Sequence, residues 1–320
     1  MGRMLLLNNV INAQTNQVEG FCLVKSASEK INAKGNAYLD LTLSDAGGEI
    51  NAKLWDYDKS VHSFIKSECV IKVRATINIW RDTEQLKIDR VRQYNPDMDD
   101  VDISKLVASS PFDTKWMFDE LEQTAKSFDT KELSELVLYM LNERKSILLD
   151  WPAAVKLHHA HKGGLLYHTF SMLKMAKGVC EVYPALRSEL CYAGVILHDL
   201  AKMDELIVGT VGIATGYSMR GQLLGHIAMG VANIEAAARE LGTSEEIKTL
   251  MQHIILAHHS TPEFGSPKPP MFPEAEVVAT VDMLDARMFE MYDALEPVEA
   301  GGFSERQWAM DNRMLYKIKG

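Results

Sequence analysis

The spacing of apolar residues changes once along this chain of 320 residues. Up to about residue 95, apolar residues alternate or gather in short runs bounded by turns, which is typical of strands. Beyond about residue 112 they recur every three or four positions, which is typical of amphipathic helices. We therefore predict a small β domain at 1–95 and a helical domain at 112–320. The acidic, loop-like stretch at 96–111 is predicted to link them.

Five short strands are predicted in the first part, with a helical patch between the third and the fourth. The strands are expected at 20–26, 37–43, 50–55, 70–80 and 85–91, and the helical patch at 59–66. Polar turns are expected at 45–48 and 81–84. This order of elements is that of an OB barrel, a small closed sheet.

Seven helices are predicted in the second part. They are expected at 113–127, 131–148, 165–182, 186–201, 220–241, 244–258 and 274–292. The stretch 261–273 holds five of the ten prolines of the chain, so we expect a rigid, non-helical loop there.

Charge and cysteine usage exclude several classes of protein. Residues 1–95 hold 13 Lys and Arg against 11 Asp and Glu, and residues 96–320 hold 21 against 33. A uniformly basic nucleic-acid binder is therefore excluded. The four cysteines are far apart and form no Cys-x-x-Cys pair, which fits a reducing compartment. We find no signal-peptide core and no apolar run long enough to cross a membrane, so we predict a cytoplasmic protein without membrane partners.

Histidine is the residue type that points to chemistry. Nine of the ten histidines fall between His158 and His259. Several share a helix face with apolar residues, as His168 does with Met172 and Met175. One such histidine is more often a hydrogen-bonded core residue, but a series of them together with carboxylates would be costly to bury without a metal. Imidazole and carboxylate suit Mn, Fe, Co or Zn, and the absence of thiolate pairs argues against a structural zinc.

In chain order the series reads His, His-Asp, His, His and Asp. The sequence segments that contain these residues are Tyr167-His168-Thr169, Leu197-His198-Asp199-Leu200-Ala201-Lys202, Gly225-His226, His258-His259, and Val281-Asp282-Met283-Leu284-Asp285. This pattern resembles the HD superfamily of metal-dependent phosphohydrolases, which implies an all-α HD domain at 112–320 and phosphoester hydrolysis by a water that two metal ions activate.

The resemblance also implies a ligand set for two divalent ions, with Mn²⁺ or Co²⁺ expected and Fe or Zn as alternatives. The residues implied for the first ion are His168, His198, Asp199 and Asp282. His226 and His258 are implied for the second, and Asp199 is expected to bridge the two. His259 can join only if its helix ends there, because neighbours on a helix point about 100° apart. Asp285 is expected to orient a ligand from behind.

Other residues are candidates for contacting the substrate. Lys202 stands where the family has a lysine that contacts phosphate, although a solvated charge at a helix end is an equal alternative. His158, His159 and His161 precede the break at Gly163-Gly164. We expect one of them, with His161 preferred, to donate to a substrate phosphate or to protonate the leaving oxygen, and capping of the preceding loop is the structural alternative. Lys268, in the proline-rich loop, is a further candidate for phosphate.

OB barrels bind single strands by stacking bases on aromatic side chains while basic side chains follow the backbone. The binding candidates preferred here are Tyr38, Trp55, Lys34 and Lys53, and the wider set adds Trp80, Lys25, Arg74 and Lys87. For each aromatic residue a core position is equally open. The near-neutral charge of this part does not imply tight nonspecific binding.

The words Tyr38-Leu39-Asp40-Leu41-Thr42-Leu43 and Ala52-Lys53-Leu54-Trp55-Asp56 resemble OB domains of the anticodon-binding type. An OB domain followed by an HD domain at this length is similar to the YhaM family of bacterial 3′-to-5′ exoribonucleases. That resemblance implies cleavage from the 3′ end of single-stranded RNA, with single-stranded DNA as an alternative substrate.

Two other functions stay open at this point. One is an HD phosphodiesterase that acts on a free or cyclic nucleotide and carries a regulatory OB domain. The other is a nucleic-acid-binding regulator without activity, which the complete series of His and Asp disfavours. The helices at 113–148 and the stretch 303–320 could pack within the chain or against another copy, so a homo-oligomer is left open.

Overall fold

A computed structural model gives the fold of the chain. It describes residues 9–12, 17–45, 48–67, 69–80, 83–95, 97–99, 101, 106, 110–155, 159, 161–209, 212 and 214–320. The chain divides into two compact units, the first formed by Met1–Ser109 with Gly209–Val211 and the second by Ser110–Val208 with Gly212–Gly320. Most of the predicted linker at 96–111 lies outside the described residues.

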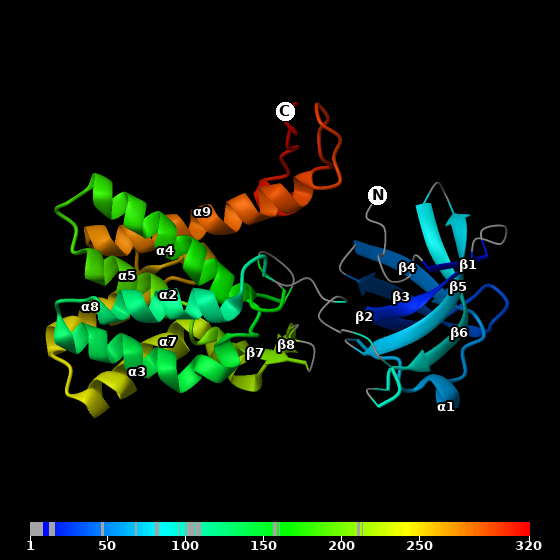
Figure 1. Cartoon of the computed structure of the whole chain (residues 1–320), viewed down its shortest axis with the longest axis horizontal. Helices are drawn as coiled ribbons and strands as arrows, with labels where there is room; N and C mark the ends of the chain where they lie inside the picture. Colours follow the sequence, from blue (N-terminus) through cyan, green and yellow to red (C-terminus); the bar gives the residue numbers. More distant parts are fainter. Residues whose placement is uncertain are drawn as a thin grey trace. The chain divides into compact units, whose positions relative to one another are not determined.

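The first unit is a closed barrel of five strands, as the sequence predicts (Figure 1). Its strands are β2 (Gln17–Ile31), β3 (Ala37–Asp45), β4 (Gly48–Leu54), β5 (Val70–Trp80) and β6 (Thr83–Gln93). The order β2-β3-β4-β6-β5 closes through pairing of β5 with β2, and β4 and β6 run parallel. A short strand, β1 (Asn9–Asn12), adds to the edge of β2. Side chains from alternate positions of the strands, such as Leu39, Leu41 and Leu43, fill the barrel.

The bounds of several elements differ from the prediction. Strand β2 is 15 residues long, because its second half leaves the core and continues as an exposed arm of the β2–β3 hairpin. Helix α1 spans only Lys59–His62. The Asp58 side chain caps it by accepting a hydrogen bond from the Ser60 backbone N–H. Thr83 and Glu84, predicted to lie in a turn, begin β6 instead. Arg81, Asp82 and the side chain of Trp80 are outside the described part.

The second unit is a bundle of helices around one apolar core (Figure 1). The helices are α2 (Thr114–Lys126), α3 (Lys131–Leu148), α4 (Gly164–Val182), α5 (Ser188–Leu197), α6 (Lys202–Glu205), α7 (Met219–Leu241), α8 (Glu245–Ala257) and α9 (Pro273–Leu295). Helix α5 is apolar on nearly all sides and lies at the centre of the core, which explains why its burial extends from Leu190 to Leu197. No helix in the described ranges is long and apolar enough to span a bilayer.

This unit corrects two predictions. It is not purely helical, because β7 (Leu206–Val208) and β8 (Ala214–Tyr217) form a small antiparallel hairpin between α6 and α7. The loop at 261–273 is not free of helix either. Pro262 opens a 3₁₀ turn, η2 (Pro262–Phe264), and Pro273 is the first residue of α9. Proline is tolerated at these first positions because the N–H it lacks would have no partner inside the helix.

Candidate metal centre

The series of histidines and aspartates comes together in the second unit from five helices. His168 lies within α4, His198 follows the last residue of α5, and His258 follows the last residue of α8. His226 lies on α7 and Asp282 on α9. His168, His198 and Asp282 have ligand atoms within 4.8 Å of one another, and so do His226, His258 and His259. The structure thus groups the predicted ligands into two neighbouring sets.

Asp199 lies between the two sets and turns one carboxylate oxygen toward each. Its Oδ2 is 3.2 Å from His198 Nε2 and 3.8 Å from His168 Nε2. Its Oδ1 is 3.4 Å from His226 Nε2 and 3.7 Å from His258 Nε2. On the first side, His168 Nε2 also lies 3.2 Å from Asp282 Oδ1 and 3.3 Å from His198 Nε2. A carboxylate with this orientation can bridge two cations.

Four imidazoles, three buried and that of His226 half-buried, are anchored through Nδ1, so that Nε2 faces the centre. His198 Nδ1 donates to the Val195 carbonyl oxygen at 2.8 Å, and His258 Nδ1 donates to that of Ile255 at 2.7 Å. The corresponding partners of His168 and His226 are carboxylates, Asp285 at 2.7 Å and Glu205 at 3.1 Å. Such bonds fix the tautomer that leaves Nε2 unprotonated and able to bind a metal.

The polar atoms at the centre are arranged to bind a cation. Asp199 Oδ1, His226 Nε2 and His258 Nε2 are fully buried and have no hydrogen-bond partner among the described residues. Buried polar atoms in native proteins nearly always have a partner. Here three of them lie together, and they are two imidazole nitrogens and a carboxylate oxygen, which is the donor set that Mn, Fe, Co and Zn accept.

The electrostatics favour positive charge at the centre. Burial by itself would lower the pKa of His168, but hydrogen bonds to Asp282 and Asp285 outweigh it and raise that pKa to about 9. Burial would likewise raise the pKa of Asp199, yet Lys202 and His198 hold it well below its ordinary value. Burial and then the neighbouring His259 lower the pKa of His258, which keeps this imidazole neutral and able to act as a ligand.

From the sequence, His259 was expected to join the ligands only if its helix ends before it, and in the structure the helix does end there. Helix α8 ends at Ala257, with His258 as the residue that caps it, so His259 lies beyond the helix. Their rings lie 4.2 Å apart, and the His259 ring is 5.2 Å from that of His226. The His259 backbone N–H donates to the buried Ser266 hydroxyl at 3.0 Å, which ties the start of the proline-rich loop to the site.

Lys202 is not a solvated charge at a helix end. Its side chain is buried, and its Nζ lies 2.7 Å from Asp199 Oδ2. Burial lowers the pKa of Lys202, but the Asp199 carboxylate more than compensates and raises it. This ammonium group therefore stays charged beside the carboxylate that links the two sets.

The histidines before α4 have different surroundings. His158 lies outside the described residues. His159 is buried, has a left-handed backbone with φ of 54°, and lies 2.7 Å through Nε2 from the same Asp285 oxygen that binds His168. Asp285 thus holds two imidazoles, as expected for a group behind the ligands. Burial lowers the pKa of His161, whose Nδ1 donates to the Lys162 carbonyl oxygen at 3.2 Å, so the assigned role of proton donor stays a prediction.

Glu205 is a residue of this site that the sequence analysis missed. Its carboxylate accepts from both the His226 backbone N–H at 3.0 Å and His226 Nδ1. Gly225, with φ of 72°, breaks the helical pattern of α7 just before His226 and leaves that N–H available to Glu205. The short distance in sequence from the His198-Asp199 doublet was the only signal, and it does not distinguish Glu205 from a solvated acidic residue.

The barrel candidates lie mostly on the outer face of β3 and β4. Tyr38 and Trp55 stack with ring centroids 4.5 Å apart, and Lys53 is 5.9 Å from the Tyr38 centroid. Lys53 also forms an ion pair with Asp40. A shallow cavity of about 310 Å³ lies beside them, lined by Lys53, Trp55, Asn78, Ile79, Gln85, Leu86 and Lys87. Lys34 is exposed in the β2–β3 loop, at a distance along the hairpin from this cavity.

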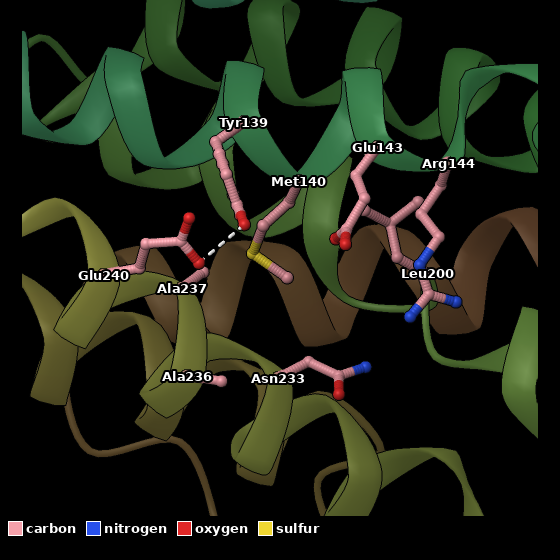
Figure 2. A pocket seen from close by; sticks show the side chains of 9 residues that line it. All are labelled: Tyr139, Met140, Glu143, Arg144, Leu200, Asn233, Ala236, Ala237 and Glu240. Carbon is pink, nitrogen blue, oxygen red and sulfur yellow. Dashed lines mark hydrogen bonds between the residues drawn. The ribbon is translucent and has the colours of Figure 1, made fainter.

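Two other places have no described contact with the metal-ligand candidates. Lys268 is exposed in the loop before α9, and among the described contacts none joins it to the metal-ligand candidates. A second cavity, of about 240 Å³, lies between α3 and α7, where Tyr139 donates to Glu240 (Figure 2). Leu200, next to Asp199, lines it, but the ligand candidates do not, so this cavity is separate from the metal centre.

Comparison with known proteins agrees with this geometry. The family model of the HD domain matches residues 165–287, which contain the whole set from His168 to Asp282. Fold and site therefore define an HD-domain protein. The chain is also 38% identical over 301 residues to the 3′-5′ exoribonuclease YhaM of Bacillus subtilis, covering 94% of this chain and 95% of that protein. The YhaM of Halalkalibacterium halodurans is 39% identical over 300 residues, with 94% and 92% covered. This chain belongs to the YhaM family.

Three solved structures each resemble a little over a quarter of this chain. The single-stranded DNA binding protein from Thermus aquaticus is 14% identical, with 28% of this chain and 45% of that chain covered and a TM-score of 0.24. The barrel topology stands on the strand order of the first unit itself.

Proposed function

We propose that this protein is a metal-dependent 3′-to-5′ exoribonuclease. The observation that carries the proposal is the pair of imidazole sets that converge on the two oxygens of Asp199, with three buried ligand atoms left unpaired. Its relatives, over almost the full length, are named 3′-5′ exoribonucleases. A nucleotidase acting on free nucleotides needs no strand-binding barrel, so the two-unit organisation favours a polynucleotide substrate. The separated cysteines support the cytoplasm as its location.

Two divalent ions, with Mn²⁺ or Co²⁺ expected, are the proposed cofactors. His168, His198, Asp199 and Asp282 would hold the first, and His226, His258 and His259 would hold the second together with Asp199. When bound, such a pair of ions lowers the pKa of a water molecule to near neutrality and neutralises phosphoryl oxygens. Sites with two metal ions are widely used for phosphodiester hydrolysis, because negative charge develops on both the attacking and the leaving oxygen.

The side chains of the chain itself supply orientation and charge. Lys202 neutralises Asp199 from the side that faces His198 and presents a fixed positive charge at the edge of the centre, where a phosphate oxygen would meet it. Asp285 and Glu205 hold His168 and His226 in the tautomer that a ligand needs. His161 is the candidate for moving a proton to the leaving oxygen, and Lys268 is a candidate for contacting phosphate.

The barrel is proposed to hold the single strand upstream of the 3′ end. The stacked rings of Tyr38 and Trp55 provide a flat apolar surface for a base, and Trp55 is 41% exposed. Lys53 beside it, and Lys34 in the neighbouring loop, provide positive charge for the backbone. RNA is the proposed strand, and single-stranded DNA is a substrate to compare in the same assay.

The test is digestion of a 5′-labelled RNA oligonucleotide by the purified protein with Mn²⁺. We expect a ladder that shortens from the 3′ end, and loss of activity by at least about a thousandfold in Asp199→Asn, because this substitution removes the charge shared by both sets. His253→Ala is the matched control, since His253 lies on α8 away from the two sets and contacts Met271. Equal digestion by wild type and Asp199→Asn would refute the proposal.

A further inference from the structure

Four aromatic side chains of the helical unit meet where α2 and the residue before it lie against α4 (Figure 1). We call them the aromatic patch: Phe112, Trp116, Tyr167 and Phe170. The Trp116 ring centroid is 4.9 Å from that of Phe170, and the Phe112 centroid is 5.8 Å from that of Tyr167. Tyr167 and Phe170 are three residues apart on α4, so they share one side of that helix.

The core of the unit accounts for only part of the aromatic patch. Phe170 belongs to this core, and Tyr167 packs partly against it. Phe112 and Trp116 are instead 44% and 43% exposed. An aromatic side chain buries about 150–250 Å² when it is fully covered, so two of them side by side leave a sizeable apolar surface in water. Contiguous apolar surface on a soluble protein marks a place where something binds.

A cation lies over the aromatic patch. The Lys174 Nζ is 4.9 Å from the Phe170 ring centroid and 5.9 Å from that of Phe112. Lys174 is exposed, and no carboxylate pairs with it in the part of the chain that the structure describes. Residues 167–174 contain no Asp or Glu, and Asp113 is engaged in capping α2. Rings beside an unpaired ammonium group are the combination that binds the bases and phosphates of a single strand.

The aromatic patch reaches the metal centre through Tyr167. The Tyr167 ring centroid is 5.1 Å from that of His159 and 6.3 Å from that of His161. His159 shares the Asp285 carboxylate with the ligand candidate His168, which follows Tyr167 in the sequence. A strand whose terminal phosphodiester lies at the metal centre must lay its next nucleotides on the surface around that centre. The aromatic patch is a surface of this kind.

We propose that the aromatic patch binds the bases next to the 3′ end of the single-stranded RNA, while Lys174 contacts a phosphate between them. This rests on the proposed exoribonuclease function and adds a strand-binding surface on the helical unit, separate from Tyr38 and Trp55 of the barrel. The exposed Phe112 and Trp116 are the rings on which bases stack. Stacking accepts every base, because each has a flat face, so the strand can advance after each cut.

The first test is steady-state kinetics on a 5′-labelled single-stranded RNA with Mn²⁺. Trp116→Ala should raise KM by roughly 5- to 100-fold, the range for losing one base stack, and leave turnover of bis-p-nitrophenyl phosphate unchanged. Trp116→Phe keeps a flat ring and should restore most of the affinity. Tyr183→Ala is the matched control, because Tyr183 is 61% exposed at the opposite end of α4, about 24 Å from Tyr167 along the helix axis.

RNA with one abasic nucleotide, placed at each of the last positions before the 3′ end in turn, tests stacking directly. Binding is measured by fluorescence anisotropy on protein carrying Asp199→Asn, so that the RNA is not cut. If Trp116 stacks on the missing base, the abasic RNA should bind about 5- to 100-fold more weakly than the intact RNA. The protein that also carries Trp116→Ala should show little further loss, because the two changes remove the same contact.

The salt dependence of the same binding tests Lys174. Adding Lys174→Gln removes one phosphate contact, so the slope of log Kd against log salt concentration should become shallower by about 0.7. A lysine that only packs on the rings would leave this slope unchanged, which would overturn the phosphate contact.

Three outcomes would overturn the role of the rings while the proposed function stands. One is an active wild type whose KM for RNA is the same in Trp116→Ala; a smaller mass of that variant in solution would then assign the aromatic patch to a protein contact. Another is equal loss on RNA and on bis-p-nitrophenyl phosphate, which would make Trp116 a support of the fold. The third is an abasic RNA that binds as tightly as the intact one. A wild type that digests no RNA would instead overturn the proposed function, and this inference with it.

Discussion

Four histidines of the metal centre, His168, His198, His226 and His258, each use Nδ1 for a bond to the protein and turn Nε2 toward the site. His168 is the clearest case, because Asp285 binds its Nδ1 while Asp282 and Asp199 face its Nε2. Orientation by a partner behind the ring commonly contributes a factor of 10 to 100 in metal affinity. The same logic makes Glu205, behind His226, a testable positioning residue.

We expect Glu205→Gln to weaken the second metal set specifically. The glutamine oxygen can still accept from the His226 backbone N–H, but its NH₂ group would face His226 Nδ1 and favour the tautomer with the proton on Nε2. Manganese affinity, measured by calorimetry, should fall about 10- to 100-fold for one of two ions. Glu235→Gln, on the exposed side of α7, is the control and should bind both ions as wild type does. Unchanged binding of both ions in Glu205→Gln would contradict this role.

At the scale of elements, the ligands are found where helices end or break. His198 and His258 each follow the last residue of a helix and donate to the carbonyl oxygen three residues earlier. The last carbonyl groups of a helix have no partner within it, so they are available to anchor a ring there. His226 follows the break at Gly225 in α7, and that break frees its N–H for Glu205.

The start of α7 packs so closely on Glu205 that Gly221 has no room for a side chain. A Cβ at Gly221 would lie 2.3 Å from the Glu205 carbonyl oxygen. We expect Gly221→Ala to push α7 away from Glu205, lowering the free energy of unfolding by about 1–3 kcal/mol and weakening activity with it. Gly178→Ala on α4 meets no atom within 4 Å and should raise stability by up to about 1 kcal/mol. Thermal and urea unfolding of both variants checks the pair, and equal stability of the two would contradict the packing argument.

At the level of the whole chain, the proposed function gives each of the two units its own role. The helical unit holds every member of the metal centre, and the barrel holds the stacked Tyr38 and Trp55. If the barrel only binds the strand, a substitution in its binding surface should lower activity on long substrates and leave activity on small ones unchanged. Under the proposed function a long RNA would contact both units, whereas a small phosphodiester would need the metal centre alone.

We therefore expect Trp55→Ala to raise KM for a long single-stranded RNA by roughly 5- to 100-fold, which is the range for losing one base stack. Turnover of bis-p-nitrophenyl phosphate should stay unchanged, because this substrate needs only the metal centre. Val61→Ala is the control within the same unit, since Val61 is exposed on α1 and neither pairs beside Tyr38 in the sheet nor lines the cavity at Trp55. Steady-state kinetics on the two substrates checks the prediction, and a parallel loss on both would contradict the division of labour.

The amino-acid sequence was enough to predict the types of secondary structure and the chemistry of the site. Period-two and period-3.6 patterns predict the barrel and the helices because burial on one face requires them, and the series from His168 to Asp282 predicts a metal site because unliganded burial would be costly. The orientation of the ligands depends on the packing of the folded chain and could not be predicted from the sequence. Glu205 and His226 are 21 residues apart, and β7, β8 and the Gly225 break bring them together. Such contacts depend on packing between elements, which no local pattern of residues records.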